Sequence, residues 1–294
     1  MKTNDAVLSQ AIEKLLVSRN LRQMKTAQAA LKPGYVLRAA TLLRDLHGSI
    51  IIGTGFPVRD TFETDGPVGA IALYEALQTL NADPWIACGG PLLSCLQQKY
   101  QTLPLKARTL KEAQQEALRY ESRLRPHALI AIEHPGLAKN GRYYNMRGED
   151  ISDRCSIFDP YLSHLSCPTI AIGDGGNEAG MGNISKALKQ LDIKPSQTGC
   201  DELIVADVSN WAAYGVIGFL GRWAGKDLLA AVAPRQILGF LSEHGSVDGV
   251  TRLNTLTEDG LDAQEGIDLI QDIRRLCHGQ AQSIYSNPAF GGIL

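Results

Sequence analysis

Short apolar runs alternate with amphipathic helical patterns along most of this chain, and that alternation restricts the fold more than any other feature. Runs rich in β-branched residues are expected to be strands, and longer segments with apolar residues at helical spacing are expected to be helices. The expected strands are residues 49–54, 85–88, 128–132, 169–172 and 203–206, and the expected helices are 67–80, 92–100, 110–124, 184–191 and 211–224. The pattern predicts an α/β fold with a mainly parallel open sheet and helices on both faces.

The whole chain, residues 1–294, is expected to form a single α/β domain. Residues 1–47 are expected to form an N-terminal helical segment, with a break at Pro33-Gly34. Residues 48–253 are expected to form the catalytic core, which includes a long functional loop at 136–168. Residues 254–294 are expected to supply a C-terminal helix and a loose tail, SNPAFGGIL. Helical spacing places the last two helices at 234–243 and 263–278.

The charge balance and the cysteine pattern narrow the class of partner. Lys and Arg total 29 against 31 for Asp and Glu, and no basic tract with interleaved aromatic residues occurs. Nucleic-acid binding is therefore not expected, and a small-molecule partner is favoured. The six cysteines include no C-x-x-C pair, which argues against a zinc knuckle and a disulfide framework and favours a reducing cytoplasm. The N-terminal segment lacks a signal-peptide core, and no apolar run approaches the roughly 20 residues of a membrane span.

A glycine-rich acidic segment follows the strand at 169–172. It contains Asp174, Asn177 and Glu178, together with Gly175 and Gly176. Glycine allows positive φ and close backbone approach, while the polar side chains offer acid, base or metal-ligand groups. Asn183 is expected to cap the next helix. One cap does not account for the other polar residues, so we interpret the segment as an active-site loop at the carboxyl end of a buried strand.

The first strand, 49–54, leads into a second candidate loop. Gly55 and its neighbours are expected to form a tight turn, and Arg59 offers a planar fork for a carboxylate. Glu63 is a candidate catalytic group with no structural role evident from the sequence, and a solvated loop carboxylate is the alternative interpretation. Asp65 has two interpretations of equal weight: a catalytic carboxylate, or the N-cap of the helix that begins at Pro67.

Two further strand ends carry polar residues. After the strand at 128–132, Asn145 and Arg147 are expected to grip an acidic substrate, whereas His134 is expected to be structural. After the strand at 203–206, Ser209 or Asn210 is expected to cap the next helix, whose first-turn N–H groups suit a carboxylate. Since parallel strands deliver their carboxyl ends to one edge, this edge is expected to collect Thr54, Glu63, Glu133, Asp174 and Ser209.

Several familiar signatures are absent. Gly53-Thr54-Gly55 lacks the third glycine of G-x-G-x-x-G, and the sequence contains no P-loop, G-x-S-x-G or H-E-x-x-H motif. These absences disfavour a dinucleotide site, a P-loop nucleotide site, a serine-hydrolase elbow and a zincin site.

Six segments together resemble the D-glutamate cyclase family: GTGFP, ETDGPVGA, YYNMRGEDIS, IGDGGNEAGMGN, VSNWAAYG and SVDGVT. The resemblance covers most of residues 53–253. It implies a hydro-lyase that converts D-glutamate to 5-oxo-D-proline and water. Some members are longer, mitochondrial and carry an additional hydratase-like region, which this chain is expected to lack. Ala179 stands where the family motif is expected to have a bulkier aliphatic residue, and Ala212 where it is expected to have glycine, so pocket shape is where this chain is expected to differ.

Such a cyclisation needs a base for the ammonium, neutralisation of the carboxylate that is attacked, and an acid for the leaving oxygen. The catalytic candidates are Asp174, Glu178, Glu63 and Asp65, and the substrate-binding candidates are Thr54, Gly55, Arg59, Asn145, Arg147, Gly175, Gly176, Asn177, Ser209 and Asn210. No organic cofactor is expected. If an ion binds, Asp174 and Glu178 favour Mg²⁺ or Mn²⁺; a carboxyl pair that shares a proton is an equal alternative.

Two other functions remain open from the residues. One is a metal-dependent hydrolase or transferase acting on a carboxylated or phosphorylated metabolite. The other is a non-catalytic protein that binds amino acids.

Overall fold

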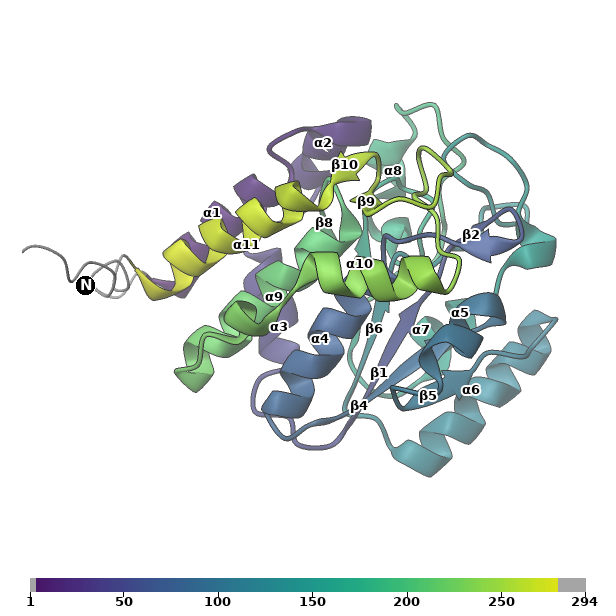
Figure 1. Cartoon of the computed structure of the whole chain (residues 1–294). Coiled ribbons are helices and arrows are strands. Elements are labelled where there is room, and N and C mark those ends of the chain that lie inside the picture. The colour runs from purple at the N-terminus through teal and green to yellow at the C-terminus, as the bar shows by residue number, and fades with distance from the viewer. Residues whose placement is uncertain (1–3, 280–294) are drawn as a thin grey trace, which may run out of the picture.

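The computed structural model describes residues 4–279, and its centre is a six-stranded, entirely parallel sheet (Figure 1). The strands are β1 (Ser49–Thr54), β4 (Asp83–Cys88), β5 (Thr102–Pro104), β6 (Ala128–Ile132), β7 (Thr169–Gly173) and β8 (Glu202–Val205). Two short antiparallel pairs lie outside this sheet: β2 (Pro57–Val58) with β3 (Thr61–Phe62), and β9 (Thr257–Glu258) with β10 (Leu261–Asp262). The predicted parallel sheet is confirmed.

The strand order is β5-β4-β1-β6-β7-β8, so the chain builds the sheet outward from β1 in one direction and then, from β6, in the other. β1 therefore has β4 on one side and β6 on the other, with Thr54 opposite Ile132. In open parallel sheets, ligands bind beyond the carboxyl ends of the strands at this reversal. The topology thus directs attention to the loops after β1 and β6.

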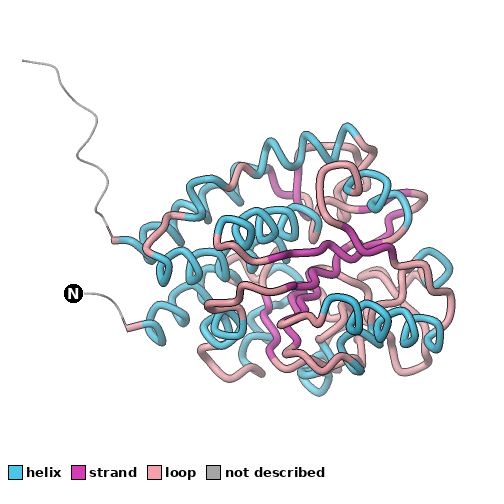
Figure 2. Tube along the Cα trace, turned by 90° about the horizontal axis from the view of Figure 1, so that it is seen from below, coloured by secondary structure: helices cyan, strands magenta, loops and turns pink. Residues whose placement is uncertain are grey.

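Helices cover both faces of the sheet, as Figure 2 shows from below. Thr54 points toward Gly66, at the start of α4, whereas a Cβ atom on Gly53 would lie 2.2 Å from the Phe158 ring, at the start of α7. Because neighbouring strand residues point to opposite faces, α4 and α7 lie on opposite sides of the sheet. The helices are α1 (Asp5–Leu16), α2 (Met24–Ala29), α3 (Tyr35–Leu42), α4 (Pro67–Thr79), α5 (Gly90–Leu96), α6 (Leu110–Leu124), α7 (Asp159–His164), α8 (Ser185–Leu188), α9 (Ser209–Ala224), α10 (Pro234–Glu243) and α11 (Ala263–His278).

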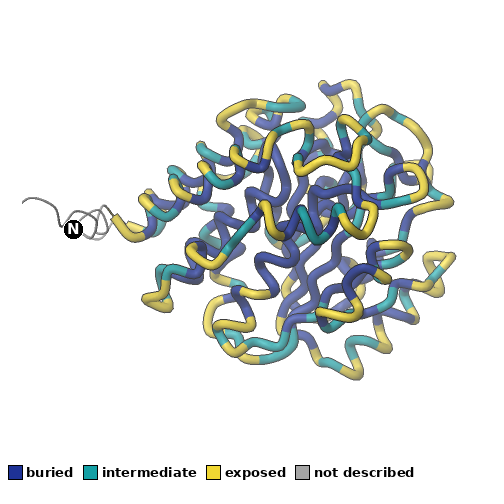
Figure 3. The backbone as a smooth tube through the Cα atoms, viewed as in Figure 1, coloured by how far each residue is buried: buried dark blue, intermediate teal, exposed yellow. Residues whose placement is uncertain are grey.

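Local sequence explains why several boundaries match the prediction to the residue. β1 is carried by Ile50, Ile51 and Ile52, which are fully buried, and Figure 3 shows the sheet as the buried centre of the molecule. α6 begins where the Thr109 side chain accepts a hydrogen bond from Glu112 N. β1, β6, α6, α10 and α11 have the predicted bounds.

Other predicted boundaries differ. β5 was not predicted, because three residues carry too little periodicity to be recognised. The predicted loop 136–168 contains α7 and the 3-10 turn Ser152–Arg154. The predicted helix at 184–191 is a 3-10 turn, Met181–Ile184, followed by the four residues of α8.

Asn183 does not cap a helix, so that prediction is wrong. It lies inside the 3-10 turn, and its side chain donates to Cys200 O at 2.8 Å and accepts from Cys200 N at 3.1 Å. The side chain therefore hydrogen-bonds the segment before β8, and local sequence does not reveal such an interaction.

The first and last helices pack together, and both pack on α9. Leu8, Ile12 and Leu16 of α1 and Ile273 and Cys277 of α11 belong to the same hydrophobic cluster as the strands. The N-terminal helical segment therefore extends the core, which places the turn after α1 beside the sheet. The predicted tail lies outside the described residues. In residues 4–279, no helix is long and apolar enough to cross a membrane.

Candidate active site at the carboxyl edge of the sheet

A pocket lies where the loops after β1, β6 and β7 meet, with walls from the segments around residues 145–154 and 249–259. Its acidic lining residues are Glu63, Glu133, Glu149, Asp174, Glu178 and Asp259, and its basic lining residues are Arg22, Arg59, Arg147, Arg154 and Arg252. Most of the residues predicted from sequence are brought together. Arg59, Glu63, Asn145, Arg147, Asp174, Gly175, Asn177 and Glu178 line the pocket.

The remaining predicted residues lie around this pocket. Ser209 donates its hydroxyl to Glu133 Oε2 at 2.6 Å, and its backbone N–H lies 3.2 Å from Asp174 Oδ2. Asp65 and Asn210 are buried beside Ser209. Thr54 is buried, and its hydroxyl has no hydrogen-bond partner in the described chain. Gly55 lines a neighbouring pocket instead. The predicted residues that follow four strands, β1, β6, β7 and β8, do meet at one edge of the sheet.

The floor of the pocket is a cluster of buried carboxylates. Three carboxylate oxygens, one from each residue, lie within 4.8 Å of one another in the group Glu133, Asp174 and Glu178. The same is true of a second group, Asp65, Asp174 and Asp259. Asp174 belongs to both groups and is therefore at the centre. Carboxylates this close repel one another, so either some of them are protonated or a cation compensates their charge.

The glycine loop orients Glu178. Its two carboxylate oxygens accept from Gly175 N at 2.9 Å and Gly176 N at 2.7 Å. Gly176 has φ +99°, a conformation that side chains rarely adopt. The loop therefore needs glycine for its backbone path, and that path aims two N–H groups at one carboxylate.

Sequence reasoning missed Arg22, whose side chain is 16% exposed and lies between two of the carboxylates. Its Nη2 is 2.8 Å from Asp174 Oδ2 and 2.7 Å from Asp259 Oδ2, and its Nε donates to Asp174 O at 2.9 Å. Nothing in the local pattern after α1 marks this arginine. Asp259, in the β9–β10 hairpin turn, was also missed, although the acidic pair Glu258-Asp259 before a glycine was visible.

Asp207, two residues after β8, holds the backbone that carries Arg22. Its carboxylate accepts from Arg19 N at 2.8 Å, Asn20 N at 3.2 Å and Leu21 N at 2.7 Å. Arg22 itself has φ +47°. Three amides gathered on one carboxylate stabilise this uncommon turn, which places the guanidinium in the pocket.

α4 and α9 exchange caps across the site. Asp65, just before α4, accepts from Ser209 N at 2.9 Å and Asn210 N at 2.8 Å in the first turn of α9. Asn210 Oδ1 in turn accepts from Gly66 N at 2.9 Å and Gly69 N at 2.6 Å at the start of α4. The predicted local caps are therefore wrong: Asp65 does not cap α4, and Ser209 and Asn210 lie inside α9, which their side chains do not cap. A substrate carboxylate at this turn would compete with Asp65.

Asn210→Ala is expected to lower the free energy of unfolding by about 3 kcal/mol, because it removes the side-chain acceptor of Gly69 N and one of the two acceptors of Gly66 N, which keeps Asp65 Oδ1. It also removes the amide that donates to Glu258 Oε1 at 2.7 Å. Urea unfolding measures the loss. Asn140→Ala is the matched control, since Asn140 is exposed and its side chain bonds only Tyr144 Oη among the residues that the structure describes. Equal, small effects of both variants would contradict the crossed caps.

Burial dominates the electrostatics of the cluster. It raises the pKa of Glu133, Glu63 and Asp174 well above the usual carboxyl range, with Arg22 opposing the shift at Asp174. Burial raises the pKa of Asp65 to about 6. Burial also raises the pKa of Glu178, but its bonds from backbone N–H groups oppose that shift. Among Glu133, Asp174 and Glu178, only Glu178 accepts from two backbone N–H groups, and these bonds support its ionised form.

The donor set fits a hard divalent cation. Glu133, Asp174 and Glu178 supply carboxylate oxygens, which suit Mg²⁺ or Mn²⁺ rather than zinc. In the group of Asp65, Asp174 and Asp259, the Arg22 guanidinium already contacts two of the three carboxylates. Glu133, Asp174 and Glu178 are therefore the residues that could hold an ion.

His134 contributes no ligand to these groups. Its ring is buried and stacks on Phe158 with ring centroids 4.8 Å apart, and burial lowers its pKa to about 4. These contacts fit the structural role that the sequence predicts for it.

Two arginines fasten loops over the pocket. Arg147 donates to Gly249 O at 3.4 Å and to Val250 O at 2.7 Å, and Arg252 pairs with Glu149 at 2.7 Å. Both contacts join the loop around residue 147 to the loop around residue 250. Arg59 has no hydrogen bond or ion pair from its guanidinium within residues 4–279, so it is free to meet a ligand.

Comparisons with known proteins agree with the sequence resemblance. The mitochondrial D-glutamate cyclase of Homo sapiens is 27% identical over 264 residues, covering 72% of this chain and 43% of the human protein. The chain thus spans less than half the length of that relative. The crystal structure of an exopolyphosphatase-related protein from Bacteroides fragilis is similar with a TM-score of 0.43 and 10% identity, covering 86% of this chain and 62% of that chain. This likeness is too low to carry an argument.

The family model described as D-glutamate cyclase-like, C-terminal matches residues 12–274. That range contains every residue of the pocket described above. The protein therefore belongs to the D-glutamate cyclase-like family.

Proposed function

We propose that the protein converts D-glutamate to 5-oxo-D-proline with release of water. The observation that carries the proposal is the buried group of Glu133, Asp174 and Glu178, whose oxygens lie within 4.8 Å of one another beside Arg22. Family membership supports the choice of substrate, because the human relative is named a D-glutamate cyclase.

The reaction forms a bond between the α-nitrogen and the γ-carboxyl carbon and breaks one bond from that carbon to oxygen. Two protons leave the nitrogen, and two reach the departing oxygen, which leaves as water. Protein groups that pass these protons from nitrogen to oxygen therefore have the same protonation state before and after the reaction. A site for this reaction needs one ionised carboxylate and one protonated carboxyl close together.

The cluster supplies both kinds of group. Glu178 is assigned as the ionised member, because Gly175 N and Gly176 N donate to it. Glu133 and Asp174, whose pKa values burial raises well above the usual range, are assigned as the members that hold a proton near neutral pH. An ion on these three residues would supply positive charge to the carboxylate under attack.

Two residues with unused hydrogen-bonding groups are assigned to substrate binding. Asn177 lines the pocket, and its buried Oδ1 has no partner in the described chain, so it can accept from the substrate ammonium. Arg59 can pair with the α-carboxylate through its unpaired guanidinium. Both contacts hold groups on the α-carbon, so the γ-carboxyl group would remain free to fold back toward the substrate nitrogen.

Incubation with D-glutamate and L-glutamate, followed by chiral detection of 5-oxoproline, tests the proposal. We expect product from D-glutamate between pH 6 and 9, a range that spans plausible pKa values of general bases. Parallel reactions with EDTA and with added Mn²⁺ or Mg²⁺ decide between an ion and proton-sharing carboxyls. No conversion of D-glutamate in any of these conditions overturns the function.

Failure of that experiment would leave the two other functions that the residues allow. Turnover of another carboxylated or phosphorylated metabolite that depends strictly on metal would indicate a hydrolase or transferase. Binding of an amino acid without product would indicate a non-catalytic binding protein.

We also propose that the protein works in the cytoplasm, although the human relative is named as mitochondrial. The six cysteines are all free thiols, and five of them are buried. Buried free thiols suit a reducing compartment.

A further inference from the structure

A second pocket lies beside the candidate active site, at the carboxyl ends of β1 and β4. Its volume is about 260 Å³, just below the ~300–1,000 Å³ typical of small-molecule sites, so it suits a small ligand. Its lining includes Arg59, Arg108 and Arg154. Arg59 and Arg154 also line the candidate active site, so the two pockets share a wall.

These three guanidinium groups have no carboxylate partner in residues 4–279. Within the described residues, the Arg154 guanidinium donates only to a backbone oxygen, Arg59 O, at 3.2 Å. Asp60 and Asp153 line the same pocket without pairing with any of the three. Unpaired positive charges gathered around one pocket repel one another, and an anion bound among them would relieve that repulsion.

The backbone gives a second, independent indication at Arg59. It occupies the turn between β2 and β3 with φ +52°, where glycine or asparagine is accommodated more easily. An arginine at such a position strains the backbone. Strain of this kind is concentrated at functional sites, where the side chain has a role that compensates for it.

We propose that this second pocket binds a dianion of the phosphate class. Three planar guanidinium forks can use more acceptor oxygens than one carboxylate offers, and a phosphate group supplies them with nearly two negative charges at pH 7. Because Arg59 lines both pockets, an anion bound here competes with substrate for its guanidinium. The competition with substrate rests on the proposed function, whereas the binding of the anion does not.

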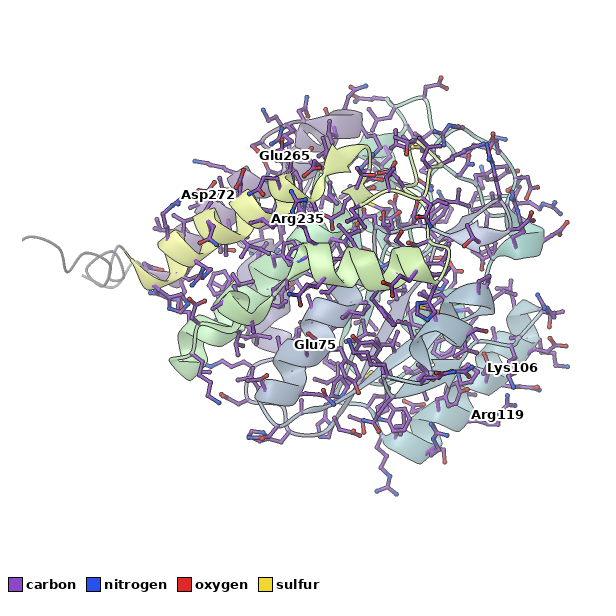
Figure 4. All side chains as sticks on the ribbon, viewed as in Figure 1. Glu75, Lys106, Arg119, Arg235, Glu265 and Asp272 are labelled. Atoms are coloured by element: carbon purple, nitrogen blue, oxygen red, sulfur yellow. The ribbon has the colours of Figure 1, made fainter. Side chains whose placement is uncertain are left out.

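Isothermal titration calorimetry with inorganic phosphate tests the binding. We expect Arg108→Gln to weaken phosphate binding at least tenfold, since Arg108 lines the second pocket and not the candidate active site. Arg119→Gln is the matched control, because Arg119 is an exposed arginine of α6 (Figure 4) that lines neither pocket. Equal binding by all three proteins, or no heat with millimolar phosphate, overturns the proposal.

Arg59→Gly separates binding from folding. Glycine removes the guanidinium and relieves the positive φ, so phosphate binding should weaken at least tenfold while the melting temperature stays equal or rises. Unchanged phosphate affinity in this variant contradicts the proposal.

Two further ligands define the chemistry. Acetate should bind much more weakly than phosphate, and equal affinity excludes the phosphate class. Glycerol 3-phosphate distinguishes the source: tighter binding than inorganic phosphate indicates a phosphate monoester, and weaker binding indicates the free ion, both within the proposed class.

The effect on substrate is measured last. Phosphate should raise the KM for D-glutamate in the unmodified protein and leave it unchanged in Arg108→Gln, whose activity without phosphate should be normal. If no cyclisation occurs, the proposed function fails while the calorimetry still decides the anion site. If cyclisation occurs and calorimetry shows no binding, only the anion site fails.

Discussion

Asp174→Asn is expected to reduce formation of 5-oxo-D-proline by on the order of 10³-fold, the typical effect of losing a group that exchanges protons during catalysis. Asp174 is the only residue that belongs to both described carboxylate groups. Asparagine keeps an oxygen that can accept from Ser209 N and from Arg22, but it cannot take up or release a proton. Initial rates at saturating D-glutamate measure the effect.

The same substitution should leave the fold almost unchanged. It replaces the carboxyl group by an amide of nearly the same size, and Arg22 retains its contact with Asp259 at 2.7 Å. We therefore expect the melting temperature to stay within about 4 °C, which corresponds to roughly 1 kcal/mol for a protein of this size. Asp192→Asn, at an exposed carboxylate, is the control and should retain full activity. Full activity of Asp174→Asn would move the chemistry to another residue.

The free energy of unfolding is expected to fall by several kcal/mol between pH 5 and pH 9 in metal-free protein. Burial raises the pKa of Asp65 to about 6 and that of Glu258 to about 8. The folded state therefore keeps protons that the unfolded chain has already released. The stabilisation is complete below the ordinary carboxyl pKa values near 4, and it is lost as the pH rises through about 6 and then about 8.

Urea unfolding at pH 5, 7 and 9, at constant ionic strength, measures this dependence. Glu258→Gln should flatten the upper part of the curve, because glutamine keeps an oxygen for the Asn210 amide but does not titrate. Asp83→Asn should leave the decrease between pH 5 and pH 9 unchanged, since hydrogen bonds lower the pKa of that carboxyl below its usual value. Stability that stays constant or increases up to pH 9 would show that the cluster is ionised in the folded state.

The parts of this structure that follow from local pattern were predictable. β1 and β6 are short runs of apolar residues, so their bounds and their parallel pairing could be expected from sequence. The glycine loop was recognisable because Asp174 and Glu178 have no local structural reason to lie among glycines. Membership in one pocket followed from topology alone, since parallel strands end at the same edge.

The parts that depend on distant contacts were not predictable. Asp65 and Asn210 each look like a cap for the helix that follows them, and only the packing of α4 on α9 reveals that they exchange roles. Arg22 lies in a segment with no motif, and its importance comes from a turn that Asp207 fixes from a different part of the chain. Pattern reading locates elements, but it does not reveal which side chain reaches which neighbour.

The ion pair between Arg22 and Asp259 joins residues 237 positions apart in the sequence. During translation the arginine is added early, and the aspartate is added only after all six strands of the main sheet, the last of which ends at Val205. A nascent chain arrested before residue 259 would hold the acidic floor of the pocket without this wall. In a timed translation reaction, ligand binding should therefore begin only when synthesis has passed the β9–β10 hairpin. Binding would then indicate that the sheet and its surrounding loops have all been synthesised.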